Sequence, residues 1–131
     1  MDLSNNTVLV TGGASGIGLA LAVRFHQAGS VVVICGRRAD KLAEAKAAHP
    51  ALHTHVANVS TAADRQNLVQ WAVGEFPGLN VIVNNAGIQR RVNLAENEPR
   101  LEKPTSMQIS VTVRLAARSR SWARSMRRLV R

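Results

Sequence analysis

Several residue types that would point to particular classes of protein are scarce or missing in this sequence. Cys35 is the only cysteine, which excludes an intramolecular disulfide and a cysteine-based metal cluster. Tyrosine is absent, so no phenol is available for acid–base chemistry. No apolar run reaches the ~18 residues of a membrane-spanning helix, and residues 1–6 have neither the basic start nor the apolar stretch of a secretory signal. We therefore expect a soluble, cytoplasmic protein without a transmembrane segment.

The net charge of +9 is concentrated at one end of the chain. Residues 1–99 hold eight basic and seven acidic residues, whereas residues 100–131 hold nine basic residues and a single acidic one, Glu102. A basic charge spread over the whole fold would suggest a nucleic-acid or anionic-surface partner, but this one is local. The chain length and the 46% of hydrophobic residues suit one globular unit. We expect a folded region over 1–99 and an Arg-rich tail over 100–131.

Short apolar runs alternate with helical stretches along the first region. The spacing predicts strands over residues 7–10, 30–35, 52–58 and 80–84, and helices over 17–28, 40–49 and about 61–76. Gly29, Pro50 and Pro77 end the three helices, and Thr61 followed by Asp64 resembles a helix cap. Four strands alternating with three helices predict a parallel α/β sheet, which is half of a doubly wound fold. Such a sheet binds its ligand beyond the carboxyl ends of the strands.

The pattern breaks down after Pro99. Two spacings compete there: a strand-like alternation of Ile109, Val111, Val113 and Leu115, and a helical face formed by Leu115, Trp122, Met126 and Leu129. We assign this segment no secure structure and treat it as an irregular basic tail. The fourth strand is then expected to be an exposed apolar edge through which the protein aggregates or self-associates.

A glycine-rich turn, TGGASGIG, occupies residues 11–18 between the first strand and the first helix. Its glycines allow a tight turn, a close approach of the backbone to a pyrophosphate and close packing of helix on sheet, while the helix N-terminus faces the phosphates. A turn without a ligand is the alternative, and a Walker P-loop is excluded because no Gly-Lys-Ser/Thr follows. The cofactor-binding residues expected from this turn are Gly12, Ala14, Ser15, Gly16, Ile17 and Gly18.

A second motif, Asn-Asn-Ala-Gly, follows the fourth strand at residues 84–87. Alone it could be a plain turn, because Asn and Gly both tolerate positive φ. Together with the glycine turn it makes the chain resemble the short-chain dehydrogenase/reductase family, over residues 5 to about 95. The resemblance implies an NAD(P)-binding oxidoreductase with a Rossmann-type fold and the strand order 3-2-1-4. It also gives Asn85, Ala86 and Gly87 the roles of steadying the central sheet and lining the adenine ribose side of the cofactor.

The residues at the end of the second strand indicate which of the two nicotinamide cofactors is bound. An acidic residue there would bind the ribose 2′-hydroxyl of NAD, whereas an Arg accommodates the 2′-phosphate of NADP. The sequence reads Gly36-Arg37-Arg38 without an acid, and a guanidinium makes charge-assisted bonds to phosphate. NADP is therefore favoured over NAD, and two solvated arginines at a helix start are the alternative.

The third strand is followed by Asn58-Val59, where the resemblance implies Asp-Val with a carboxylate that accepts from the adenine amino group. The Asn58 carboxamide oxygen can accept the same bond without charge, so we expect a weakened adenine contact from these two residues. The four histidines, His26, His49, His53 and His55, form no pattern of metal ligands, and we expect no metal site.

The resemblance also implies catalytic residues that this chain lacks. The family uses a Tyr as general acid/base, a Lys four residues later that lowers the Tyr pKa, and a Ser that positions the substrate carbonyl. The chain has no Tyr, and Lys103 is the only Lys after Lys46. The Asn that a member carries on the next helix is not found around residues 108–111 either. We therefore assign no catalytic residues.

Two interpretations of the function follow from the sequence. The first is a member of this oxidoreductase family, truncated or out of frame after about residue 95 to 100, with little or no hydride-transfer activity alone and an unknown substrate. A comparison of the other reading frames of its gene would test this. The second is a non-catalytic NADP-binding protein whose basic tail binds nucleic acid or an anionic membrane. We do not favour nucleic acid as a partner of this chain, because residues 1–99 are nearly neutral.

Overall fold

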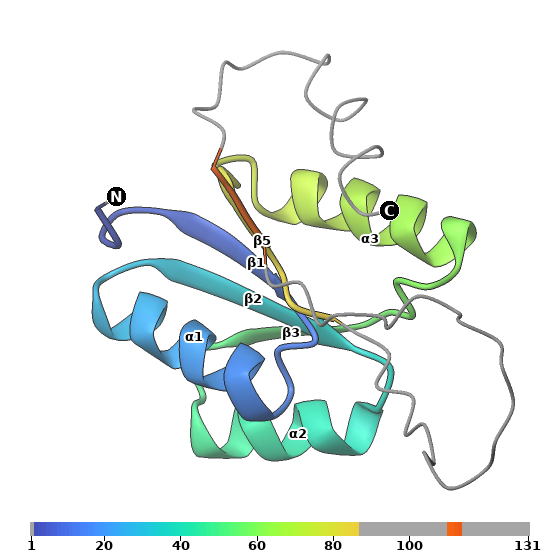
Figure 1. Cartoon of the computed structure of the whole chain (residues 1–131), viewed down its shortest axis with the longest axis horizontal. Coiled ribbons are helices and arrows are strands. Elements are labelled where there is room, and N and C mark those ends of the chain that lie inside the picture. Colours follow the sequence, from blue (N-terminus) through green and yellow to red (C-terminus); the bar gives the residue numbers. More distant parts are fainter. Residues whose placement is uncertain (1, 87–109, 114–131) are drawn as a thin grey trace, which may run out of the picture.

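The structure of the protein is a computed structural model that describes residues 2–86 and 110–113. Within these ranges three helices flank a five-stranded sheet (Figure 1). The strands are β1 (Thr7–Thr11), β2 (Val31–Gly36), β3 (His53–Val56), β4 (Val81–Asn84) and β5 (Ser110–Val113). The helices are α1 (Gly16–Gln27), α2 (Ala39–Ala48) and α3 (Ala62–Glu75).

The first four strands are parallel and lie in the order β3-β2-β1-β4, as the resemblance predicts. β1 is central, so Val10 lies between Ile34 of β2 and Val83 of β4. All three side chains are fully buried, because helices cover both faces of the sheet at its centre. The prediction of a Rossmann-type α/β fold is confirmed.

The core has two layers, one on each side of the sheet. Helices α1 and α2 cover one face and α3 covers the other (Figure 1). The alternation of side chains along β1 supplies both layers, since Val8 and Val10 face α1 while Leu9 faces α3. Burial of this apolar surface fixes the strands, and with them the turns at their carboxyl ends.

The helix boundaries have local causes that the sequence signals. α1 ends before Gly29, whose φ of +97° is the left-handed conformation that closes a helix without the strain of a Cβ. α2 ends next to His49 and Pro50. α3 begins after Thr61, whose side-chain oxygen accepts a hydrogen bond from the Asp64 backbone N–H at 3.4 Å. The predicted cap is therefore confirmed.

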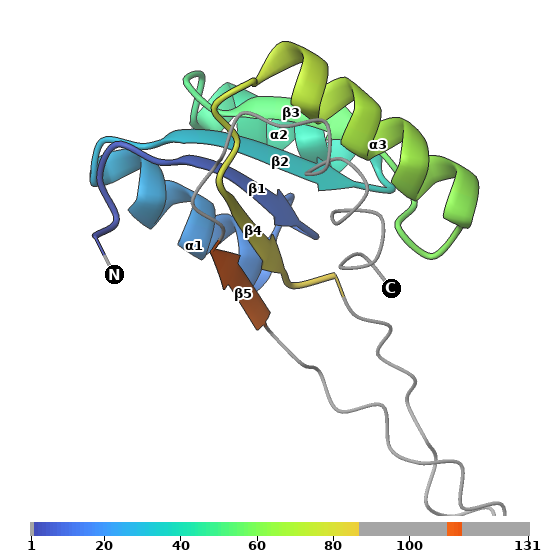
Figure 2. The same ribbon diagram turned by 90° about the horizontal axis from the view of Figure 1, so that it is seen from above.

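The fourth strand is not the exposed edge that we expected. β5 pairs with β4 in antiparallel register, from Val81 opposite Val113 to Asn84 opposite Ser110 (Figure 2). The expectation of an unpaired β4 edge is wrong, and part of the segment left without an assignment is a strand.

Two physical tendencies favour this strand. The alternation around Val111 and Val113 is one of the two competing spacings in the sequence, and β-branched residues suit strands. An unpaired parallel strand also presents a row of backbone N–H and C=O groups that any nearby extended segment can pair with. The helical alternative over 115–129 and the rest of the expected basic tail lie outside the described residues.

Cys35 reports on the integrity of the core. Its side chain is fully buried in β2, and burial raises the pKa of the thiol from 9.0 to about 12. Because the thiolate is the reactive form, this shift alone lowers the reactive fraction near neutral pH about 1,000-fold. We expect an aromatic disulfide reagent to label Cys35 at least that much more slowly in buffer than in urea. Similar labelling rates in both solvents would show that the β2 layer opens readily.

The role of β5 is tested by proline at neighbouring positions. In a strand, adjacent backbone N–H groups point to opposite sides, so only one of Val111→Pro and Thr112→Pro removes an N–H directed at β4. The variant that breaks the ladder should expose β4 and self-associate, as measured by size exclusion with light scattering. The other variant is the matched control and should elute like the wild type. Identical behaviour of all three proteins would show that β5 does not protect the edge.

Candidate functional site

The candidate site lies at the carboxyl ends of the parallel strands and starts from the glycine turn between β1 and α1. Gly12 has φ +64°, a left-handed conformation that side chains rarely adopt, so the turn needs glycine there. α1 begins directly after Ser15, which makes no side-chain capping bond to the helix. The first amides of α1 are thus not capped by their own N-cap side chain, which suits the binding of an anion.

Gly18 lets the first helix approach the sheet closely. A Cβ at this position would overlap the Gly12 carbonyl oxygen and the Asn85 side-chain nitrogen. The neighbouring Gly13 is similarly confined, since a Cβ there would lie 2.7 Å from Ile34 Cγ2. Gly13 and Gly18 therefore have a packing reason independent of any ligand.

The Asn-Asn-Ala-Gly motif is bonded directly to this turn. The Thr11 side-chain oxygen accepts hydrogen bonds from the backbone N–H groups of Asn85 and Ala86, each at 3.1 Å. The Asn85 Nδ2 donates to the Gly12 carbonyl oxygen at 3.1 Å. The two motifs are 73 residues apart in the sequence and form one unit at the end of the sheet. Gly87, the last predicted residue of the motif, lies outside the described residues.

One polar atom in this unit is left over. Asn85 Oδ1 is buried and has no hydrogen-bond partner among the described residues. A buried acceptor without a partner costs free energy unless a water or another group supplies a donor.

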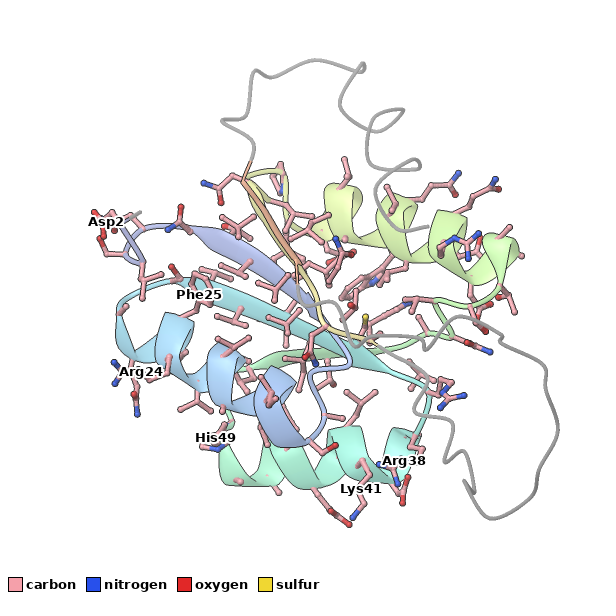
Figure 3. The ribbon with its side chains drawn as sticks, viewed as in Figure 1. Asp2, Arg24, Phe25, Arg38, Lys41 and His49 are labelled. Carbon is pink, nitrogen blue, oxygen red and sulfur yellow. The ribbon has the colours of Figure 1, made fainter. Side chains whose placement is uncertain are left out.

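The predicted arginine pair follows β2 beside the glycine turn. The Gly13 backbone N–H donates to the Cys35 carbonyl oxygen at 3.2 Å, which joins the turn to the end of β2. Arg37 and Arg38 are exposed, and Arg38 is the N-cap residue of α2 near Lys41 (Figure 3). The one ion pair within residues 2–86 joins Lys41 and Glu44 at 2.9 Å. Neither guanidinium group therefore forms an ion pair with a described carboxylate.

The turn after β3 holds Asn58 in a network that the sequence analysis missed. The Asn58 Oδ1 accepts from the backbone N–H of Ser60 at 3.1 Å and from the Ser60 hydroxyl at 2.6 Å. The Asn58 backbone N–H donates to Asp64 Oδ2 at 2.8 Å. Arg65 donates to the carbonyl oxygen of Val59, the other residue predicted here, at 2.8 Å. The signal for this network was the Asn-x-Ser spacing, which is typical of a side-chain turn.

The predicted cofactor residues thus fall into one row along the sheet. The Ala57 N–H donates to the Gly36 carbonyl oxygen at 2.9 Å, so the turn after β3 lies next to the end of β2. Ala14, Ser15, Gly16 and Ile17 lie in the turn or the first helical residues, with Ser15 and Ile17 exposed. The row runs from Asn58 past the arginines and the glycine turn to Asn85 and Ala86.

The histidines of β3 contact aromatic rings instead of each other. His55 stacks on Trp71 with ring centroids 4.0 Å apart, and His53 meets the edge of Phe76 at 4.9 Å. Desolvation lowers the pKa of both imidazoles. Within residues 2–86 and 110–113, no three His, Cys, Asp or Glu side chains lie close enough to hold a metal ion, and no helix is long and apolar enough to cross a membrane.

Comparison with known proteins identifies the family. The short chain dehydrogenase model matches residues 6–121 of the chain. The chain is 48% identical over 101 residues to the uncharacterized oxidoreductase DltE of Bacillus subtilis, which covers 77% of this chain and 40% of that protein. It is 38% identical over 96 residues to the farnesol dehydrogenase of Aedes aegypti, covering 70% of this chain and 39% of that one. The chain belongs to the short-chain dehydrogenase family of oxidoreductases, whose members bind NAD(P).

Solved structures agree with this placement. The 2-keto-3-deoxy-D-gluconate dehydrogenase of Streptococcus agalactiae shares the fold with a TM-score of 0.64 and 24% identity, over 75% of this chain and 38% of that one. The NADP complex of RhlG from Pseudomonas aeruginosa matches with a TM-score of 0.60 and 36% identity, over 66% and 36%. The chain spans about 40% of the length of the curated relatives it matches.

The close approach at Gly18 can be tested with a matched pair of substitutions. Gly18→Ala forces the glycine turn away from Asn85, so the free energy of unfolding should fall by about 1 to 3 kcal/mol and nucleotide binding should be lost. Gly74→Ala is the control, because a Cβ there meets nothing within 4 Å and helical alanine is favoured over glycine. Thermal melting and titration with NADP measure both effects. Unchanged binding in Gly18→Ala would contradict the placement of the site.

Proposed function

We propose that this chain binds NADP in preference to NAD, through the row of residues at the carboxyl ends of β1 to β4. The observation that carries this proposal is the exposed pair Arg37 and Arg38 beside the glycine turn, with no described carboxylate paired to either. A guanidinium binds a phosphate monoester with charge-assisted bonds, whereas the ribose hydroxyl of NAD favours an acid at this place. That the similar RhlG was solved with NADP supports the proposal.

The residues present fit a dinucleotide. The uncapped start of α1 supplies backbone N–H groups for the pyrophosphate, and the confined Gly18 leaves no side chain between helix and sheet. Asn85 and Ala86 lie on the other flank of the turn and hold it in place from the β4 side. The buried oxygen of Asn85 lacks a described partner at this same place.

We further propose that the chain alone has little or no hydride-transfer activity. Bound NADP would supply a hydride donor or acceptor, but a carbonyl substrate also needs a proton donor, and the chain holds no tyrosine. Cys35 is buried with a raised pKa, so it cannot take this role near neutral pH. We propose no substrate, because this chain spans only about 40% of the length of its relatives.

The division into a nucleotide-binding half-domain at 1–99 and an Arg-rich tail at 100–131 stays a prediction. The family match reaches residue 121, and β5 belongs to the same sheet as β1 to β4, so the two regions are not independent in structure. The alternative of a non-catalytic protein with a nucleic-acid or membrane-binding tail has no specific observation in its favour. A cytoplasmic location also stays a prediction.

The cofactor preference is tested with adenosine 2′,5′-bisphosphate and AMP, which differ only in the 2′-phosphate. Arg37→Ala should weaken binding of the bisphosphate about tenfold or more and leave AMP nearly unchanged, because one charge-assisted bond is worth about 1.5 to 3 kcal/mol. Arg38→Ala should produce part of the same loss.

The matched control is Arg24→Ala, which removes the same charge from the last turn of α1 (Figure 3). Binding of both ligands should then change little, because Arg24 lies at the opposite end of α1 from the glycine turn. Calorimetry on the wild type and the three variants gives the four pairs of affinities. Equal affinity of the wild type for the two ligands would refute the proposed preference.

A further inference from the structure

Asn58 lies where the purine base of the proposed nucleotide would end. Gly36 of β2 pairs with Val56 of β3, and the Ala57 N–H bonds to the Gly36 carbonyl oxygen, so Asn58 is the next residue along the carboxyl edge. If the phosphates lie at the glycine turn and the ribose at Arg37, the base extends toward β3. This placement rests on the proposed function.

The hydrogen bonds of the β3–α3 turn fix which end of the Asn58 carboxamide is available. A backbone N–H can only donate, so the atom that faces the Ser60 N–H at 3.1 Å must be the oxygen, Oδ1. The Ser60 hydroxyl donates to the same oxygen at 2.6 Å. A carbonyl oxygen has two lone pairs, and both have a donor here.

The other end of the carboxamide is a hydrogen-bond donor, whereas the sequence suggested an acceptor. Asn58 Nδ2 makes no hydrogen bond to any described residue, and the side chain is only partly buried. An amide nitrogen offers two donors and no acceptor. The expected bond from the adenine amino group to the Asn58 oxygen would have to compete with two bonds inside the turn.

We infer that Asn58 presents a hydrogen-bond donor to the base, so that the site does not select adenine through its exocyclic amino group. The exocyclic amino group of adenine is a donor and cannot accept a hydrogen bond from the Asn58 amide nitrogen. Hypoxanthine carries an oxygen in place of that amino group and can accept from Nδ2. Asn58 is therefore a specificity residue that permits a 6-oxopurine nucleotide in this site.

The test compares adenosine 2′,5′-bisphosphate with inosine 2′,5′-bisphosphate. The two ligands carry the same charge, so any change in the electrostatic potential of a variant cancels in the ratio of their dissociation constants. The wild type should bind them within about threefold of each other or favour inosine, since it makes no bond to the adenine amino group.

Asn58→Asp should restore selection for adenine. The carboxylate has nearly the same shape, one oxygen can still accept from Ser60, and the second oxygen becomes an acceptor for the amino group. We expect this variant to favour adenosine over inosine bisphosphate about tenfold or more. Ser60→Ala keeps the backbone bond but frees one lone pair of Asn58 Oδ1, so its ratio should move in the same direction by a smaller amount.

The outcomes separate the two proposals. Binding of neither bisphosphate to the wild type would overturn the proposed function and this inference with it. Binding of both with a tenfold preference for adenosine in the wild type would overturn the inference alone, and so would a ratio that neither variant changes. Melting curves of the variants confirm that they fold, and if Asn58→Asp does not fold, the wild type and Ser60→Ala carry the test.

Discussion

The hydroxyl of Thr11 is the interaction on which the arrangement of the site depends. It ends the central strand, is almost fully buried and accepts from two consecutive backbone N–H groups, those of Asn85 and Ala86. Its own proton can go to the Val83 carbonyl oxygen at 3.4 Å. A residue without an oxygen at this position would leave two N–H groups unpaired next to the core. The turn after β4 is therefore positioned by the last residue of β1, and the bond from Asn85 to Gly12 follows from that placement.

Much of the fold was predictable because its signals are local. The glycine turn, the stop at Gly29 and the cap at Thr61 each act within a few residues. The apolar runs of β1, β2 and β4 are short, rich in β-branched residues and followed by glycine or asparagine, which favours strands over helices. The strand order needed the family resemblance, since periodicity gives elements and not their neighbours. β5 could not be predicted, because strand and helix spacing competed in its segment and only the unpaired edge of β4 decides between them.

That the predicted site residues would lie along one edge of the sheet followed from the sequence, but the bonds between them did not. Gly12, Gly18 and Asn85 each follow from a motif, yet the contact between them depends on the register of β1 against β4. The role predicted for Asn58 did not take account of Ser60, whose backbone N–H bonds to the Asn58 side chain. A motif comparison treats each position separately and does not include such a bond. Short-range hydrogen bonds of a loop thus decide which atom of a predicted residue is already bonded and which is still available.

The central strand β1 precedes both of its neighbours in the sequence, and this sets the order in which the site can form. β1 can pair with β2 after one short crossover. Its partner on the other side, β4, begins 74 residues after the start of β1, and the bond from the Thr7 N–H to the Asn80 side chain, just before β4, spans 73 residues. During synthesis, the glycine turn therefore emerges before Asn85, and its bond to the Asn85 side chain can form only later. Local pairs form before distant ones because closing a longer loop costs more conformational entropy. The nascent chain would acquire its hydrophobic layers strand by strand, while competence to hold a nucleotide would arrive in a single late step, when β4 docks.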